Sequence, residues 1–171
     1  MDSTAEITTS AHSNCDQDLV SPFTRSTQEV FQTMLACECE FGKPQSGPIA
    51  HTTDQVTAVI GLSGHMIGSI TISFSTKTAT NILDRILGIE TDEVDDFVRD
   101  AIGEVANTIA GKGKRDLSQF ELDLGLPQVI VGGNYCLYSP KWAQHSWVPM
   151  ESELGSGTLD VGFDIHRSAR R

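Results

Sequence analysis

Residues 94–115 of the chain have the sequence VDDFVRDAIGEVANTIAGKGKR, and they carry the most regular apolar pattern in the chain. From Val94 through Phe97 to Ala110, apolar residues recur at steps of three and four, which predicts a long amphipathic helix with one buried face. The basic residues between positions 112 and 115 would lie at its carboxyl end, where positive charge offsets the helix dipole. We therefore expect this helix to anchor the core.

The polar residues of the same stretch fall on a stripe outside the apolar sector. Asp100, Glu104, Asn107 and Gly111 lie together on it, and Glu104 and Asn107 leave the same face with Cβ atoms about 5–6 Å apart. An ordinary solvated face would also carry Glu and Asn, so the E-x-x-N spacing alone is a weak signal. Gly103 and Gly111 strengthen it, because the pattern places both on the exposed side, where each costs about 1 kcal/mol relative to Ala. Glycine there leaves room for the backbone of another molecule.

Shorter elements surround this helix. Between Ile67 and Phe74, apolar residues largely alternate with small or hydroxyl residues, as in a half-buried strand, and Ser63-Gly64 before them indicates a hairpin turn. The order of elements predicts a single α+β domain with a mainly antiparallel sheet and helices packed on it. The expected strands are residues 55–62, 65–74, 128–131, 136–138, 146–153 and 158–166, with turns at 132–134 and 155–157 and a further helix at 76–87 that ends at Gly88.

The amino-terminal region divides into a tail and a helix. Residues 1–20 are rich in Ser, Thr, Asp and Asn without sustained periodicity, which predicts a disordered polar tail ahead of a domain at residues 21–167. Ser26 and Glu29 have the spacing of a capping box, so we expect the first helix to begin at Ser26 and to run to about Glu40.

Charge and cysteine usage narrow the class of protein. The chain has 171 residues, of which 23 are acidic and 12 basic, and its net charge of -11 would repel nucleic acid and anionic membranes. It has no apolar run long enough to cross a bilayer. The four cysteines form no disulfide framework, and the five histidines show no ligand spacing. A site at Cys37 and Cys39 is conceivable, but reduced thiols beside a helix are the favoured interpretation, so we expect a cytoplasmic protein with no metal of its own.

Residues 100–111, DAIGEVANTIAG, resemble the signature helix of the CheC/CheX phosphatase family. Several other segments are similar to the CheX members of that family, and the likeness covers about residues 20–167. These segments are the opening helix at 26–35, the hairpin at 59–64 followed by 68–70, the stretch LPQVIVG at 126–132 and the turn at 153–155.

The resemblance implies a phosphatase that removes the phosphoryl group from the aspartate of a CheY-like response regulator. It implies Glu104 and Asn107 as the catalytic pair, with Asp100 at the acidic position of the signature, and Asp100, Gly103 and Gly111 would contact the partner. It further implies a homodimer built by joining sheets, and a divalent cation, Mg²⁺, that belongs to the regulator.

The implied chemistry suits an amide and a carboxylate. Phosphoryl transfer to water passes through a loose transition state, so Asn107 need only hold the attacking water in line, while Glu104 would pair with the regulator's active-site lysine. Glu29 and Gln32 share the same spacing, but the capping box explains Glu29 better than a second site does.

Two other classes of function remain open. The domain could be a non-catalytic module that binds a response regulator or a flagellar switch component, although an intact Glu104/Asn107 pair argues against this. An unrelated enzyme is a weaker alternative, since the sequence contains no Walker, G-x-S-x-G or H-E-x-x-H motif. Gly132-Gly133-Asn134 precedes an expected strand and not a helix, so it is not a nucleotide loop.

Overall fold

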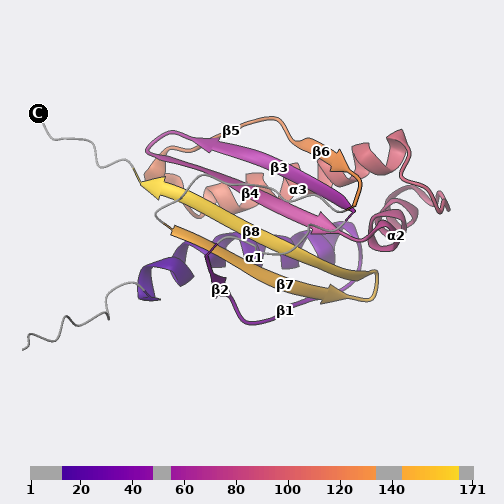
Figure 1. Cartoon of the computed structure of the whole chain (residues 1–171), viewed down its shortest axis with the longest axis horizontal. Helices are drawn as coiled ribbons and strands as arrows, with labels where there is room; N and C mark the ends of the chain where they lie inside the picture. The colour runs from indigo at the N-terminus through magenta and orange to yellow at the C-terminus, as the bar shows by residue number, and fades with distance from the viewer. Residues whose placement is uncertain (1–12, 48–54, 134–143, 166–171) are drawn as a thin grey trace, which may run out of the picture.

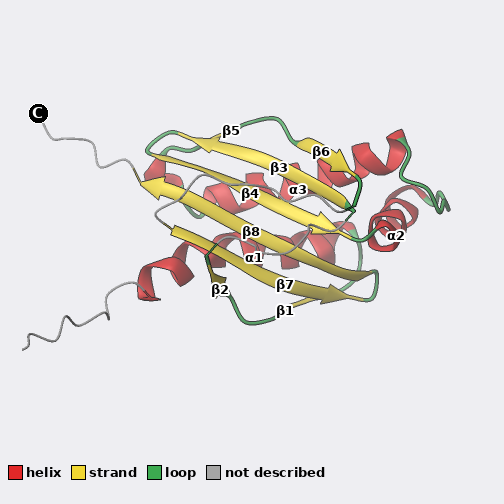
Figure 2. Ribbon diagram, viewed as in Figure 1, coloured by secondary structure: helices red, strands yellow, loops and turns green. Residues whose placement is uncertain are grey.

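The computed structural model describes residues 13–47, 55–133 and 144–165, which form one sheet covered on one face by helices (Figure 1, Figure 2). This is the α+β arrangement that the order of elements predicts. The helices are α1 (Ser13–Met34), α2 (Thr76–Leu87) and α3 (Asp96–Arg115), and a 3₁₀ turn spans Ser118–Phe120. The strands are β1 (Cys39–Phe41), β2 (Gln45–Ser46), β3 (Val56–Ser63), β4 (Met66–Phe74), β5 (Asp123–Leu124), β6 (Gln128–Val131), β7 (Gln144–Ser152) and β8 (Gly155–Ile165).

The sheet is built around the β3–β4 hairpin and the β7–β8 hairpin. The described strands lie in the order β1-β7-β8-β4-β3-β5, with β2 also paired to β7 and β6 to β3, and each of these pairings is antiparallel. Gly64 turns the first hairpin with a φ of 125°, a conformation that favours glycine. The expected turn at Ser63-Gly64 and the antiparallel sheet are therefore confirmed.

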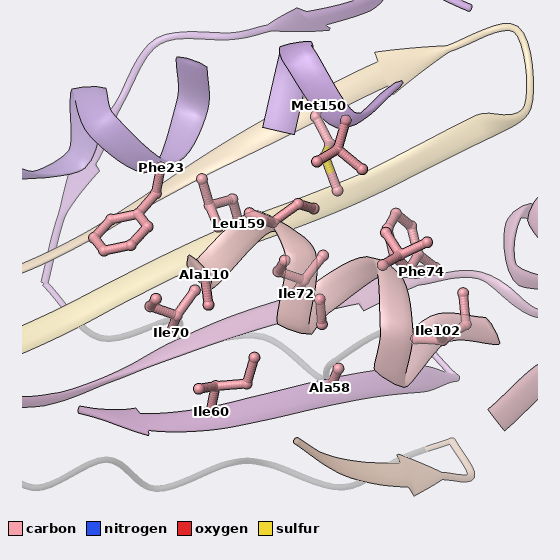
Figure 3. Packing of buried hydrophobic residues seen from close by; sticks show 14 of the residues in the cluster. Phe23, Ala58, Ile60, Ile70, Ile72, Phe74, Ile102, Ala110, Met150 and Leu159 are labelled. Atoms are coloured by element: carbon pink, nitrogen blue, oxygen red, sulfur yellow. The ribbon is translucent and has the colours of Figure 1, made fainter. Parts of the chain in front are cut away.

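The core lies between the helices and the sheet face that they cover. Alternate residues of the central strands point into it, among them Ile60, Ile70 and Ile72, each about 1% exposed. Helix α1 packs beside β1 and β7, whereas α3 packs over β3 and β6, so the two helices cover opposite halves of the face. Figure 3 shows Phe23 of α1 and Ala110 of α3 in the same layer as the side chains of the strands.

Helix α1 differs from the sequence-based expectation at its amino end. It includes residues 13–20, where the sequence predicts a tail, and it continues through Pro22. The Ser26 hydroxyl donates a hydrogen bond to the Phe23 carbonyl oxygen at 3.0 Å, so Ser26 lies inside the helix and the expected capping box is wrong. Proline disfavours helix on its amino-terminal side, but burial of Val20 and Phe23, 3% and 0% exposed, offsets that local preference.

The ends of two other elements also differ. Helix α1 ends at Met34 and not near Glu40, because Cys39–Phe41 form a short strand against β7. Gly155 and Gly157 belong to β8, and the turn lies two residues earlier than expected, at Glu153-Leu154. Both differences arise because these residues pair with β7. Strand β7 is remote from β1 in the sequence, and no local pattern marks where its pairing with β8 begins. The strand expected at 136–138 lies outside the described residues.

Helices α2 and α3 match their predictions closely. Helix α2 spans the predicted residues and ends at Gly88, whose φ is 65°. Helix α3 begins after Asp95, whose carboxylate accepts a hydrogen bond from the Val98 backbone N–H at 2.9 Å. No helix in residues 13–47, 55–133 or 144–165 is long and apolar enough to span a membrane.

Close packing of α1 against α3 depends on a glycine. A Cβ atom built on Gly113 would lie 2.6 Å from Cε1 of the Phe23 ring, which is fully buried and cannot turn away. Gly113 is itself buried in the last turns of α3. The absence of a side chain there allows the two helices to approach closely.

We expect Gly113→Ala to lower the free energy of unfolding by about 1–3 kcal/mol, because the added methyl group overpacks the contact with Phe23. Gly111→Ala is the matched control, since nothing lies within 4 Å of its Cβ position, and it should raise stability by up to about 1 kcal/mol. Denaturant midpoints of the two variants measure both effects. A Gly113→Ala variant as stable as Gly111→Ala would contradict the packing.

Candidate functional site

The orientation of α3 is set by its buried face. Ile102, Val105 and Ile109 are 0% exposed and pack into the core, so the opposite side of the helix faces solvent. Asp100, Glu104 and Asn107 are exposed on that side, where the periodicity places them. The structure thus brings a carboxylate and an amide side by side on a rigid support, one turn from a second carboxylate.

An open groove of about 630 Å³ runs beside these residues. One wall is the exposed side of α3, and the other comes from the segment that leads into β6, which pairs with β3. Val129 lies opposite Ala58 in that pairing, so its side chain points toward the helices. The groove is lined by Arg99, Asp100, Gly103, Glu104, Asn107, Pro127 and Val129.

Gly103 occupies a different environment from the one expected. It is buried and not exposed, because the wall of the groove covers it. A Cβ atom at Gly103 would lie 3.6 Å from Cγ2 of Val129 and 3.9 Å from Cγ of Pro127, which is ordinary van der Waals contact. Gly103 therefore lies at the floor of the groove. Gly111 is helical and has open space around it.

The polar groups of the groove differ in how they are held. The Arg99 guanidinium pairs with Asp96 and donates to the Val94 carbonyl oxygen at 3.4 Å, so the cation is tied to the start of α3. Within the described residues, the side chains of Glu104 and Asn107 make no hydrogen bond or ion pair. Both remain available to an incoming molecule.

Three lining residues were not singled out as site residues from the sequence. Pro127 and Val129 reach the groove only because β6 pairs with β3, a contact between residues about 70 positions apart. The Leu126-Pro127 pair, one residue before the apolar run at 129–131, is the one local signal that could have marked this wall. Arg99 lies three residues after Asp96, a spacing typical of a surface ion pair.

The second pair with this spacing, Glu29 and Gln32 on α1, is engaged differently. The Glu29 carboxylate accepts a hydrogen bond from Lys112 of α3, and this contact holds the pKa of the carboxyl below its ordinary value. Glu29 therefore connects α1 to α3, which replaces the capping-box explanation.

Cysteines and metal ligands contribute no further site in the described residues. No group of three or more His, Cys, Asp or Glu side chains among them could hold a metal ion. Cys37 and Cys39 are free and buried. Burial raises the pKa of both thiols, that of Cys39 to about 12, with neighbouring negative groups contributing further.

Comparison with known proteins gives consistent matches over most of the chain. A family model described as chemotaxis phosphatase CheX matches residues 56–151. The CheY-P phosphatase CheX of Thermotoga maritima is 30% identical over 120 residues, which cover 68% of this chain and 77% of that protein.

Solved structures agree with these matches. A CheC-like superfamily protein from Shewanella sp. PV-4 superposes with a TM-score of 0.80 at 28% identity, covering 89% of this chain and 99% of that one. CheX in the CheX–CheY–BeF₃–Mg²⁺ complex of Borrelia burgdorferi superposes with a TM-score of 0.74 at 28% identity, covering 85% and 97%.

The antiparallel sheet with helices on one face, together with the superposition on the Shewanella structure, defines a protein of the CheC-like class. Within that class, both the family model and the relative from Thermotoga maritima are CheX. The chain belongs to the CheX family of chemotaxis phosphatases.

We expect Cys37 and Cys39 to resist alkylation in the native protein, because burial keeps both thiols protonated at neutral and mildly alkaline pH. Iodoacetamide at pH 8, followed by peptide mass spectrometry, should label the two residues only after denaturant is added. Native labelling at the rate of the unfolded chain would show that these thiols are accessible.

Proposed function

We propose that this chain hydrolyses the aspartyl phosphate of a phosphorylated CheY-type response regulator. The observation that carries the proposal is the Glu104–Asn107 pair, exposed side by side at an open groove and without a side-chain partner in the described residues. The relative that forms a complex with CheY, BeF₃ and Mg²⁺ supports a regulator of this kind as the partner.

Asn107 orients the attacking water in this mechanism. Its amide oxygen accepts a hydrogen bond from the water and holds it in line with the scissile P–O bond. Hydrolysis through a loose transition state depends on positioning more than on strong base catalysis, so a neutral amide is sufficient. A carboxylate at the same place would repel the phosphoryl oxygens.

Glu104 fixes the docked geometry by pairing with the regulator's active-site lysine. Its charge is carried on α3 beside Asp100, so the groove offers two carboxylates to a cationic partner group. The divalent cation that neutralises the phosphoryl oxygens belongs to the regulator and not to this chain. Gly111 leaves open space one turn beyond Asn107, where the regulator's backbone can approach α3.

The cellular setting follows from the same partner. CheY-type regulators act in the cytoplasm, and we place this chain there. A homodimer formed by joining the sheets of two copies remains a prediction, with the edge strands of the sheet as its candidate contacts.

Asn107→Ala should lower phosphate release about 100-fold or more, because the water loses its positioning group. Affinity for the regulator loaded with BeF₃ and Mg²⁺ should stay close to wild type, and calorimetric binding is the control. A variant that keeps more than half of the wild-type turnover would remove Asn107 from the mechanism. Binding by the wild type without any phosphate release would instead favour the non-catalytic interaction module.

Glu104→Gln should weaken regulator binding at least 10-fold, because losing one member of a desolvated charge pair costs about 2–5 kcal/mol. Glu38→Gln is the matched control: it makes the same change in net charge at an exposed position outside the groove and should leave affinity unchanged. Binding titrations at two salt concentrations measure the effect. The affinity of the wild type for the regulator should fall more steeply with salt than that of Glu104→Gln. Equal affinities for the two variants would refute the pairing.

A further inference from the structure

Two exposed apolar side chains flank the Glu104–Asn107 pair. Phe97 is 57% exposed and Leu126 is 89% exposed. Single exposed apolar residues are common on protein surfaces, so the position of these two, and not their number, carries the argument. The large apolar residues exposed in the described part of the chain are Ile67, Leu87, Ile89, Phe97, Leu126 and Val131.

Phe97 lies on the same side of α3 as the catalytic pair. The sequence pattern predicts it on the buried face, but it is exposed in the first turn of the helix, beyond the edge of the core. Seven residues separate it from Glu104, which corresponds to about 10 Å along the axis and about 20° around it. Phe97 therefore extends the stripe of Asp100, Glu104 and Asn107 toward the start of the helix.

Leu126 borders the pair from the other wall of the groove. Near the end of α3, Nζ of Lys114 lies 4.0 Å from Oδ1 of Asp123. Nearer the start of the helix, Gly103 lies against Pro127 and Val129. Residues 123–129 therefore run antiparallel to α3, and Leu126 falls between these two contacts. Seen around the helix, Leu126 and Phe97 lie on opposite sides of the catalytic pair.

The backbone around Leu126 is held rigidly although its side chain is exposed. The Gly125 N–H donates to the Gly61 carbonyl oxygen at 2.9 Å, which ties the preceding residue to β3. Pro127 restricts the backbone of Leu126 itself and leads directly into β6. An apolar side chain on a fixed backbone loses little conformational entropy when a partner covers it.

A partner that brings its phosphoryl group to Asn107 must also cover these two residues. The short Asn side chain requires the partner's surface to contact α3 around it. A standard interface buries about 800 Å² on each partner, a disc of about 16 Å radius. Along the helix axis Phe97 lies about 10 Å from Glu104 and about 15 Å from Asn107, so a disc centred on the pair includes it. Leu126 adjoins Pro127 in the groove wall and falls inside it as well.

We infer that Phe97 and Leu126 are the apolar anchors that dock the phosphorylated receiver domain on either side of Glu104 and Asn107. This inference rests on the proposed function. With a net charge of -11 and two carboxylates in the groove, the chain offers attraction only to the cationic part of the regulator. Apolar side chains that an interface buries supply affinity that charge does not.

Calorimetric titration tests the anchors with the receiver-domain proteins of the same genome, each loaded with BeF₃ and Mg²⁺. Phe97→Ser and Leu126→Ser should each weaken binding about 10-fold or more. Ile67→Ser is the matched control, because Ile67 is exposed on the sheet face away from the helices, and its affinity should stay within about twofold of wild type. Circular dichroism should show the same fold in all three variants. In phosphate-release assays the two anchor variants should raise KM and leave kcat unchanged, whereas misplacement of Asn107 would lower kcat.

The outcomes separate this inference from the proposed function. Wild-type phosphate release with unchanged affinity in both anchor variants would overturn the anchors and leave the phosphatase proposal standing. A change in self-association without a change in regulator binding would overturn them too, by identifying a second copy as the occupant. If the wild type neither binds nor dephosphorylates any receiver domain, the proposed function fails together with the inference.

Discussion

The contact between the Phe23 ring of α1 and Gly113 of α3 sets how closely the two helices lie on the sheet. With α1 beside it and β3 beneath it, α3 buries most of its circumference and leaves only a narrow sector in solvent. Rotation of the helix by one residue, about 100°, would bury Glu104 or Asn107 and expose core side chains. The direction in which Glu104 and Asn107 point therefore depends on packing about two to three turns away from them.

The second wall of the site depends on the sheet. Strand β6 is an edge strand held by β3, and this pairing places Pro127 and Val129 over Gly103. A side chain larger than alanine at Gly103 would push the wall outward and close the floor of the groove. The groove is thus a joint product of one helix and one edge strand, and neither element forms it alone.

The features that the sequence predicted correctly are those set by interactions between residues close together in the chain. The stripe on α3, the turn at Gly64 and the end of α2 at Gly88 follow from periodicity and backbone preference, which act over a few residues. The amino end of α1 was not predicted, because burial of Phe23 outweighs the effect of Pro22 on the helix. The Glu29 carboxylate accepts a hydrogen bond from Lys112 and does not cap the helix. The exposure of Phe97 and the burial of Gly103 were also missed. Both depend on where the core ends and where β6 lies, which are non-local facts.

The exposure of Glu104 and Asn107 suits the proposed site, which two proteins would complete together. In the free chain Glu104 faces water, where a charge interacts weakly, and docking excludes that water and strengthens each interaction across the groove. The proposed division of labour leaves the cation and the lysine on the regulator, so this chain supplies only the group that orients water and the group that registers the partner. Such a site needs few reactive groups of its own, but the partner must dock on it accurately. A rigid helix, a fixed Leu126 loop and open space at Gly111 are the features that provide it.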